Sequence, residues 1–123
     1  MREIDEHVVH CSDSDQGNVV EIRRWHLARG WKDVGYHFVI RRDGEIEVGR
    51  TLETVGAHCE GFNSHSVGTC LIGRRDFTER QFAALRRIHA MLVALFPGIK
   101  AVGHRAHNPH KTCPNFEVSE VLA

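Results

Sequence analysis

The feature that most constrains the fold is a long amphipathic segment over residues 77–96. Its apolar side chains form a stripe at helical spacing, at Leu85, Ile88, Leu92 and Leu95. Thr78 and Gln81 fit a capping box at the start of a helix, and Pro97-Gly98 ends it. We therefore expect one long helix that buries this stripe against another element, because removing apolar area from water stabilises a fold.

Short apolar or alternating runs on either side of this segment predict β-strands. In chain order, these predicted strands are residues 7–11, 35–42, 45–48, 67–72 and 99–103. A second helix is predicted over residues 19–29, with Gly30 as its stop, and Asp43-Gly44 is a hairpin turn signal. Residues 12–18, the long segment 49–68 and the tail from His104 are rich in polar residues, Gly or Pro and predict loops.

Strands that alternate with helices, with one hairpin inserted, predict an α/β domain. We expect a mixed central sheet with helices packed on its faces, formed by residues 1–123 as a single domain without an internal repeat or linker. The length of 123 residues suits one domain with one hydrophobic core.

Charge and hydropathy exclude several classes of protein. The 16 basic residues balance the 16 acidic ones, so no general attraction to nucleic acid or to an anionic membrane is expected. No run resembles a signal peptide or a membrane-spanning helix, so we expect no membrane insertion and synthesis in a cytoplasm. No coiled-coil pattern is present, and we expect a monomer.

Three residues near predicted strand ends carry side chains that bind metals. His10 closes the first strand, His104 follows the strand that ends at Gly103, and Cys113 lies in the loop after it. Two imidazoles and a thiolate suit zinc, and three protein ligands leave the fourth tetrahedral position open, as in catalytic sites. Spacing alone is a weak signal, since each histidine also fits a surface or hydrogen-bonded position. The other cysteines, Cys11, Cys59 and Cys70, are interpreted as free thiols, with Cys11 as a small core residue.

Four longer motifs occur in order along nearly the whole chain. They are VVHCS, RRWHLARGWKDVGYHFVIRRDGEIEVGR, VGAHCEGFNSHSVGTCLIG and VGHRAHNPHKTCPNF. Together they resemble the type 2 N-acetylmuramoyl-L-alanine amidase family, which includes phage endolysins and animal peptidoglycan recognition proteins. The resemblance implies the fold of that family and hydrolysis of the amide between N-acetylmuramic acid and L-alanine in bacterial peptidoglycan. The short form, without a separate cell-wall-binding domain, is most similar to the phage endolysins.

The resemblance also implies a metal site. The family holds one zinc ion with a histidine that ends the first strand, a histidine in a GH motif and a cysteine in a KxCP motif. These match His10, His104 and Cys113 of this sequence.

Four further residues receive roles in the same way. The catalytic tyrosine of the family lies in a GYH motif, which matches Tyr36, and its catalytic lysine lies two residues before the cysteine, which matches Lys111. The GAHxxGxN segment lines the substrate groove in relatives, so His58 and Asn63 become candidate contacts to the peptide or sugar. Tyr36 and Lys111 suit an oxyanion that needs donors or positive charge, although Tyr36 also suits orienting a water or passing a proton. His37 should point away from Tyr36 and is interpreted as structural.

Two other functions stay open at this point. A peptidoglycan-binding module that does not cut its ligand is one, although such relatives usually lack the zinc cysteine, and Cys113 is present. Regulation of a phage RNA polymerase is the other, since one phage member of the family has that activity. An endolysin without a signal peptide would reach the cell wall only after delivery by another factor.

The sequence also departs from the family pattern. The family often has an acidic residue in the motif HRD, where this chain has Ala106. If that carboxylate braces a ligand loop, this chain must brace its loop in another way. The segment GRRDF after Ile72 is also shorter than in many relatives.

Overall fold

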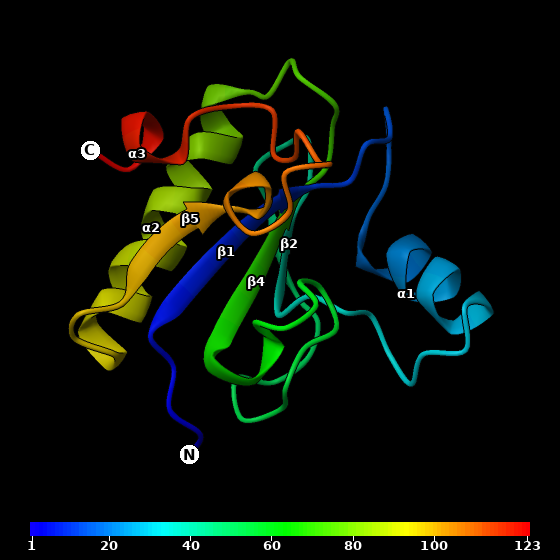
Figure 1. The fold of residues 1–123 in the computed structure, drawn as a ribbon. Helices are drawn as coiled ribbons and strands as arrows, with labels where there is room; N and C mark the ends of the chain where they lie inside the picture. Colours follow the sequence, from blue (N-terminus) through cyan, green and yellow to red (C-terminus); the bar gives the residue numbers. More distant parts are fainter.

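The computed structural model describes residues 1–123 and contains one five-stranded sheet (Figure 1). Its strands are β1 (Glu6–Cys11), β2 (Phe38–Ile40), β3 (Ile46–Val48), β4 (Ser66–Leu71) and β5 (Lys100–Gly103). Its helices are α1 (Val19–Ala28), α2 (Glu79–Leu95) and α3 (Val118–Val121), with 3-10 turns η1 (Asn63–His65) and η2 (His104–Ala106). The strand order is β3-β2-β4-β1-β5, in which only the β2–β3 pair is antiparallel. The predicted mixed sheet is confirmed.

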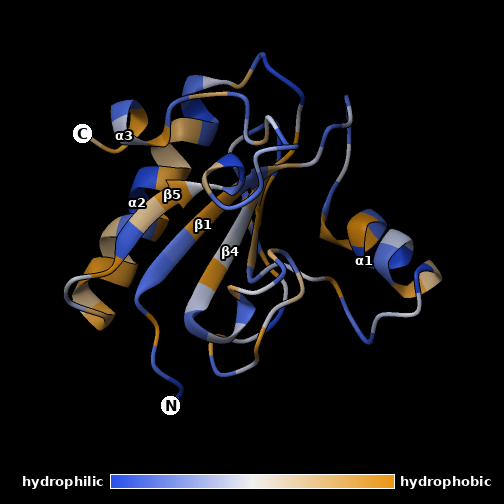
Figure 2. Ribbon diagram, viewed as in Figure 1, coloured by the Kyte–Doolittle hydropathy of each residue, from blue (hydrophilic) through white to orange (hydrophobic).

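Each face of the sheet has its own hydrophobic cluster. One cluster joins α2 to side chains of β1 and β4, such as Leu85, Leu92, Val9 and Leu71. The other lies under α1 and contains Ile22 with residues of β2 and β4. Figure 2 shows apolar segments along α2, β1 and β4, interrupted by hydrophilic ones. The helices therefore cover the two faces of the sheet as predicted.

The two long helices begin as the sequence predicts. Thr78 is the N-cap of α2, and its hydroxyl accepts from the Gln81 backbone N–H while the Gln81 side chain accepts from the Thr78 N–H. Asn18 caps α1 by accepting a hydrogen bond from the Glu21 N–H. These caps satisfy backbone donors that have no partner within a helix. None of the helices is long and apolar enough to cross a membrane.

Two predicted elements differ from the structure. The strand predicted over residues 35–42 is only Phe38–Ile40, because the carbonyls of Gly35 and Tyr36 accept from Ala57 and Arg50 of the irregular segment. The sequence predicts a loop for the tail from His104, but this tail contains η2 and the single-turn helix α3. A helix of four residues is too short to give a periodic pattern in the sequence.

Candidate functional site

Strand register brings the two histidines of the predicted metal site together. Strands β1 and β5 are parallel neighbours, and Val9 lies opposite Gly103. His10 follows Val9 on β1, and His104 directly follows β5, so both lie at the same edge of the sheet. The ring centroids of His10 and His104 are 4.5 Å apart.

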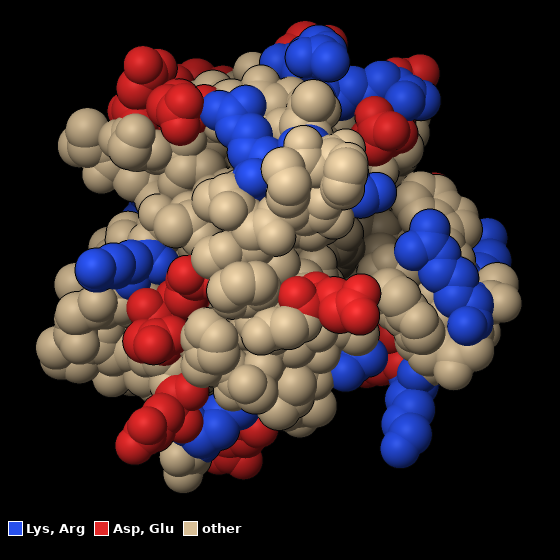
Figure 3. Space-filling view, viewed as in Figure 1, with Lys and Arg blue, Asp and Glu red and all other residues tan.

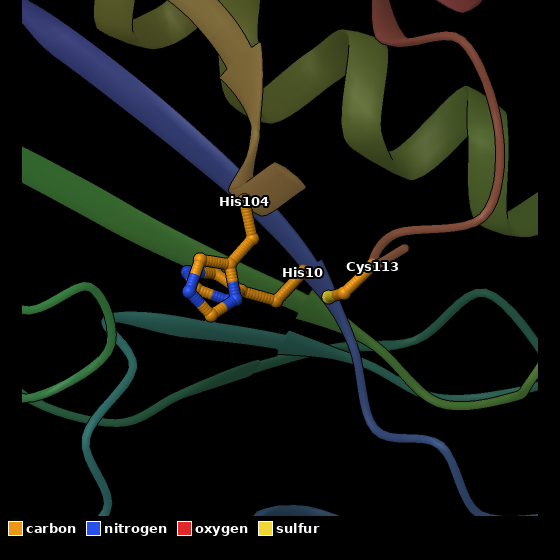
Figure 4. A group of neighbouring side chains, drawn as sticks. All are labelled: His10, His104 and Cys113. Atoms are coloured by element: carbon orange, nitrogen blue, oxygen red, sulfur yellow. The ribbon is translucent and has the colours of Figure 1, made fainter. Parts of the chain in front are cut away.

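The loop after η2 brings Cys113 to the same place. The Arg105 N–H donates to the Cys113 carbonyl at 2.8 Å, and the Cys11 N–H donates to the Cys113 Sγ at 3.0 Å. The ligand atoms of His10, His104 and Cys113 all lie within 4.8 Å of one another, and Figure 4 shows the three side chains. The three residues predicted as metal ligands therefore meet in one cluster.

Burial sets the charge of these side chains. His10 is 1% exposed, and burial, with the nearby rings of His58 and His104, keeps its pKa well below the usual value. Burial, followed by the charge of Lys111, also lowers the pKa of His104. Both imidazoles are therefore neutral at pH 7 and each keeps a lone pair for a cation.

The thiol of Cys113 is protonated in the absence of a cation. A hydrogen bond with Cys11, and then burial, raise the pKa of the Cys113 thiol. A divalent metal reverses this preference, because a coordinated thiol loses its proton. Zinc bonds measure about 2.0 Å to imidazole nitrogen and about 2.3 Å to thiolate sulfur. Small adjustments of the side chains would close the set around one such ion.

The cluster lies in an open groove with a volume of about 960 Å³. Arg29 and Trp31, which follow α1, line the groove together with Asn108 and Lys111 from the loop after η2. Figure 3 shows a hollow between the region of α1 and the central part of the molecule, with acidic and basic side chains interspersed around it. A substrate can therefore reach the cluster from solvent.

Tyr36 lies beside the cluster on the floor of the groove. Its ring centroid is 5.1 Å from that of His10. Burial raises the pKa of Tyr36 well above its usual value, and the nearby thiols Cys70 and Cys113 add to this shift. The phenol is therefore protonated and can donate a hydrogen bond.

Lys111 is exposed on the rim of the groove. Its backbone N–H donates to the Asn108 carbonyl at 3.0 Å, which closes a turn. Its charge acts on His104, whose pKa it helps to lower. The ammonium therefore lies on the solvent side of the cluster, where a substrate would pass.

His58 and Asn63 both line the groove and also build its wall. The Nδ1 of His58 is 2.9 Å from the Nε2 of His10. The Asn63 Oδ1 accepts from the backbone N–H groups of His58 and Cys59, each at 2.9 Å. These contacts fix the wall of the groove, and a contact of either residue with substrate stays a prediction.

The groove also contains His26, which receives no catalytic role from the sequence, and Trp31, which the sequence indicates is a packing residue. His26 lies with its ring centroid 5.6 Å from that of Tyr36 and 4.4 Å from that of Trp31. Its Nδ1 accepts from the Gly35 N–H at 2.8 Å, next to Tyr36. Both residues lie in the motif that contains GYH, but only tertiary contacts show that the His26 ring lies beside Tyr36 and the Trp31 ring beside His26. His37, interpreted as structural, is buried, and its Nδ1 accepts from the Gly68 N–H.

The groove of this α/β domain contains two neutral imidazoles and a thiol, beside a protonated phenol and an ammonium. These are the side chains of a metal-dependent hydrolase. Comparisons with known proteins specify the family. Residues 1–116 match the family model described as N-acetylmuramoyl-L-alanine amidase. The chain therefore belongs to the N-acetylmuramoyl-L-alanine amidase family.

Individual relatives agree with this family. The endolysin of Klebsiella phage KP32 is 45% identical over 122 residues, which cover 89% of this chain and 80% of the relative. The endolysin of Escherichia phage T7 is 42% identical over 121 residues, with the same shares of the two chains. Among solved structures, the N-acetylmuramoyl-L-alanine amidase LysC from Clostridium intestinale URNW superposes with a TM-score of 0.91 at 28% identity. That match covers 98% of this chain and 83% of LysC.

Proposed function

We propose that this chain is a phage endolysin that hydrolyses the amide between N-acetylmuramic acid and L-alanine in peptidoglycan, with one zinc ion held by His10, His104 and Cys113. The observation that carries the proposal is the meeting of these three donors on the floor of an open groove. Membership of the amidase family supports the bond that is cut.

The donor set fits zinc in number and kind. Two neutral nitrogens and one thiolate leave a fourth position free for water or substrate. When bound, zinc would polarise the substrate carbonyl and lower the pKa of a water molecule toward neutrality. The contact between His10 Nε2 and His58 Nδ1 would fix the orientation of the His10 ring. The His58 ring would be oriented in turn by the Ser66 Oγ, which lies 3.3 Å from the His58 Nε2.

Two side chains are placed to stabilise the charge that develops during amide hydrolysis. Attack on the carbonyl carbon gives a tetrahedral oxyanion, which needs donors directed at it. The protonated Tyr36 phenol on the groove floor supplies a hydrogen bond, and the Lys111 ammonium on the rim supplies positive charge. Both roles require the scissile carbonyl to lie in the groove within reach of Tyr36 and Lys111.

The proposed place of action is the bacterial cell wall. We propose synthesis in the host cytoplasm, delivery to the wall by another factor and action as a monomer on peptidoglycan. Interspersed positive and negative side chains around the groove give no surface of one sign for nucleic acid (Figure 3).

The test is digestion of purified peptidoglycan, with release of free stem peptides measured by mass spectrometry. The parent protein should contain about one zinc per chain and release stem peptides, and a chelator should abolish both. Cys113→Ser should lose most of its zinc and its activity. Tyr36→Phe should keep its zinc and lose about 10²–10³-fold in kcat, as removal of one oxyanion donor does.

Two results would contradict the proposal. Full activity of metal-free protein would exclude the zinc mechanism, and normal turnover by Tyr36→Phe would exclude the role of its hydroxyl. Zinc content with tight binding of muropeptide but no release of stem peptides would instead identify a binding module.

A further inference from the structure

The turn that carries His104 is held from the side by one residue, His107. The His107 Nε2 forms a short hydrogen bond with the Glu6 carboxylate at the start of β1. The His107 ring also stacks on Phe62, with centroids 3.6 Å apart and planes inclined by 10°. The side chains of His107 and Glu6 are only 16% and 17% exposed, so solvent competes little for this contact.

These contacts connect to both histidines of the cluster. The His107 backbone N–H donates to the His104 carbonyl at 3.0 Å and closes η2, so the position of His107 fixes the direction of His104. Phe62 ends the turn that directly follows His58, since its N–H donates to the Cys59 carbonyl at 3.0 Å. His58 in turn contacts His10.

We infer that Glu6, His107 and Phe62 form a brace that positions His104 against His10 for metal binding; the inference rests on the proposed function. His107 is a positioning residue, which acts through His104 and does not contact the metal. The brace holds together the start of β1, the turn before η1 and the turn η2, which are far apart in the sequence. Ala106, at the usual place of an acidic residue, is exposed, and the carboxylate in this brace comes from β1.

A second histidine–carboxylate pair nearby offers a matched control. The His65 Nδ1 is 2.7 Å from the Asp5 Oδ1, and the His65 ring lies 5.9 Å from the Phe62 ring. The His65 and Asp5 side chains are 38% and 77% exposed, and their hydrogen bonds are to each other and not to residues of the turn η2. Loss of this pair removes a similar interaction from the same region without freeing His104.

The experiment measures the zinc dissociation constant by competition with a chromophoric chelator, together with kcat and KM on a soluble muropeptide. His107→Ala should weaken zinc binding by about 10–100-fold, as loss of an outer-shell partner does. Its kcat at limiting zinc should fall with little change in KM, because the groove walls stay in place. Glu6→Gln keeps an oxygen acceptor, so its zinc affinity should lie between that of the parent and that of His107→Ala. His65→Ala should bind zinc as the parent does.

Folding is checked by the melting temperature and circular dichroism of each metal-free variant. If His107→Ala does not fold, His107→Phe retains the stack on Phe62 and removes only the bond to Glu6, and it should still weaken zinc binding. A folded His107 variant with the zinc affinity of the parent would overturn the brace and leave the proposed function intact. Equal losses in His65→Ala and His107→Ala would also overturn it. A parent protein that binds no zinc would overturn both proposals.

Discussion

Gly103 shows how a single missing side chain places a candidate metal ligand. The ring of Pro114, next to Cys113, lies against the end of β5, and a Cβ at residue 103 would be 2.7 Å from the Pro114 Cδ. Real Cβ atoms do not approach other atoms this closely, so any other residue would move the loop that carries Cys113. In the GH motif, the glycine therefore leaves room for Pro114, and the histidine is the candidate metal ligand.

Gly103→Ala should consequently disturb the metal site more than the sheet. The shifted loop would misplace the Cys113 Sγ, and overpacking costs about 1–3 kcal/mol of stability. We expect a lower zinc affinity and a lower melting temperature, measured by chelator competition and by calorimetry with and without zinc. Parent-like values for both would show that Pro114 can move without displacing Cys113.

At the scale of elements, α2 packs against one face of the sheet with Ala84, Leu85, Ile88 and Leu92. Leu92 is fully buried against this face, whereas Met91, one residue earlier, is 39% exposed. The contrast follows from the helical period, which places neighbouring residues on different sides of the helix. α2 contributes no candidate ligand, so its packing acts on stability and not directly on chemistry.

Leu92→Ala should therefore lower the free energy of unfolding by about 2–5 kcal/mol, because it leaves a cavity in a closely packed core. Met91→Ala, the matched surface change, should stay within about 0.5 kcal/mol of the parent. Urea denaturation of the two variants measures the difference. Equal effects of the two substitutions would contradict the assignment of the buried face of α2.

The elements also show what the sequence could and could not predict. The capping box of Thr78 and the apolar stripe of α2 are local patterns, and the capping box is confirmed. Leu85, Ile88 and Leu92 of the stripe are buried as predicted, but Leu95 in the last turn of α2 is 56% exposed, so the predicted burial is wrong there. The short extent of β2 does not follow from a local pattern. It depends on hydrogen bonds from the Ala57 and Arg50 N–H groups to the residues just before β2, which are far away in the sequence. Likewise, residue types and motifs identified His10 and His104, but their proximity follows from the register of β1 with β5, which no local pattern encodes.

For the whole molecule, buried histidines couple stability to pH. Burial lowers the pKa of His7 to about 3 and the pKa values of His26 and His37 to about 4. In the unfolded chain these rings titrate near their ordinary pKa of about 6.5. Above that pH, the rings are neutral in both states and the full stability is present. As pH falls from about 6.5 toward 4, the unfolded chain binds protons that the folded chain does not, and stability falls.

We therefore expect the urea midpoint of metal-free protein to be constant between pH 7 and 8 and to decrease steadily from pH 6.5 to 4. His110→Gln, which changes an exposed ring, should leave this slope unchanged. A midpoint that stays constant down to pH 4.5 would show that the buried rings accept protons without loss of structure.

The meeting of His10, His104 and Cys113 also has a consequence for how the protein is made. A ribosome synthesises His10 early, but the turn with His104 and the loop with Cys113 follow about a hundred residues later. The residues of β1 and its partner β4 are complete at Leu71, long before then, yet a chain of that length holds only one of the three donors. Competence for wall cleavage therefore arises late in translation, and a chain released prematurely before residue 113 would be harmless to the cell that made it.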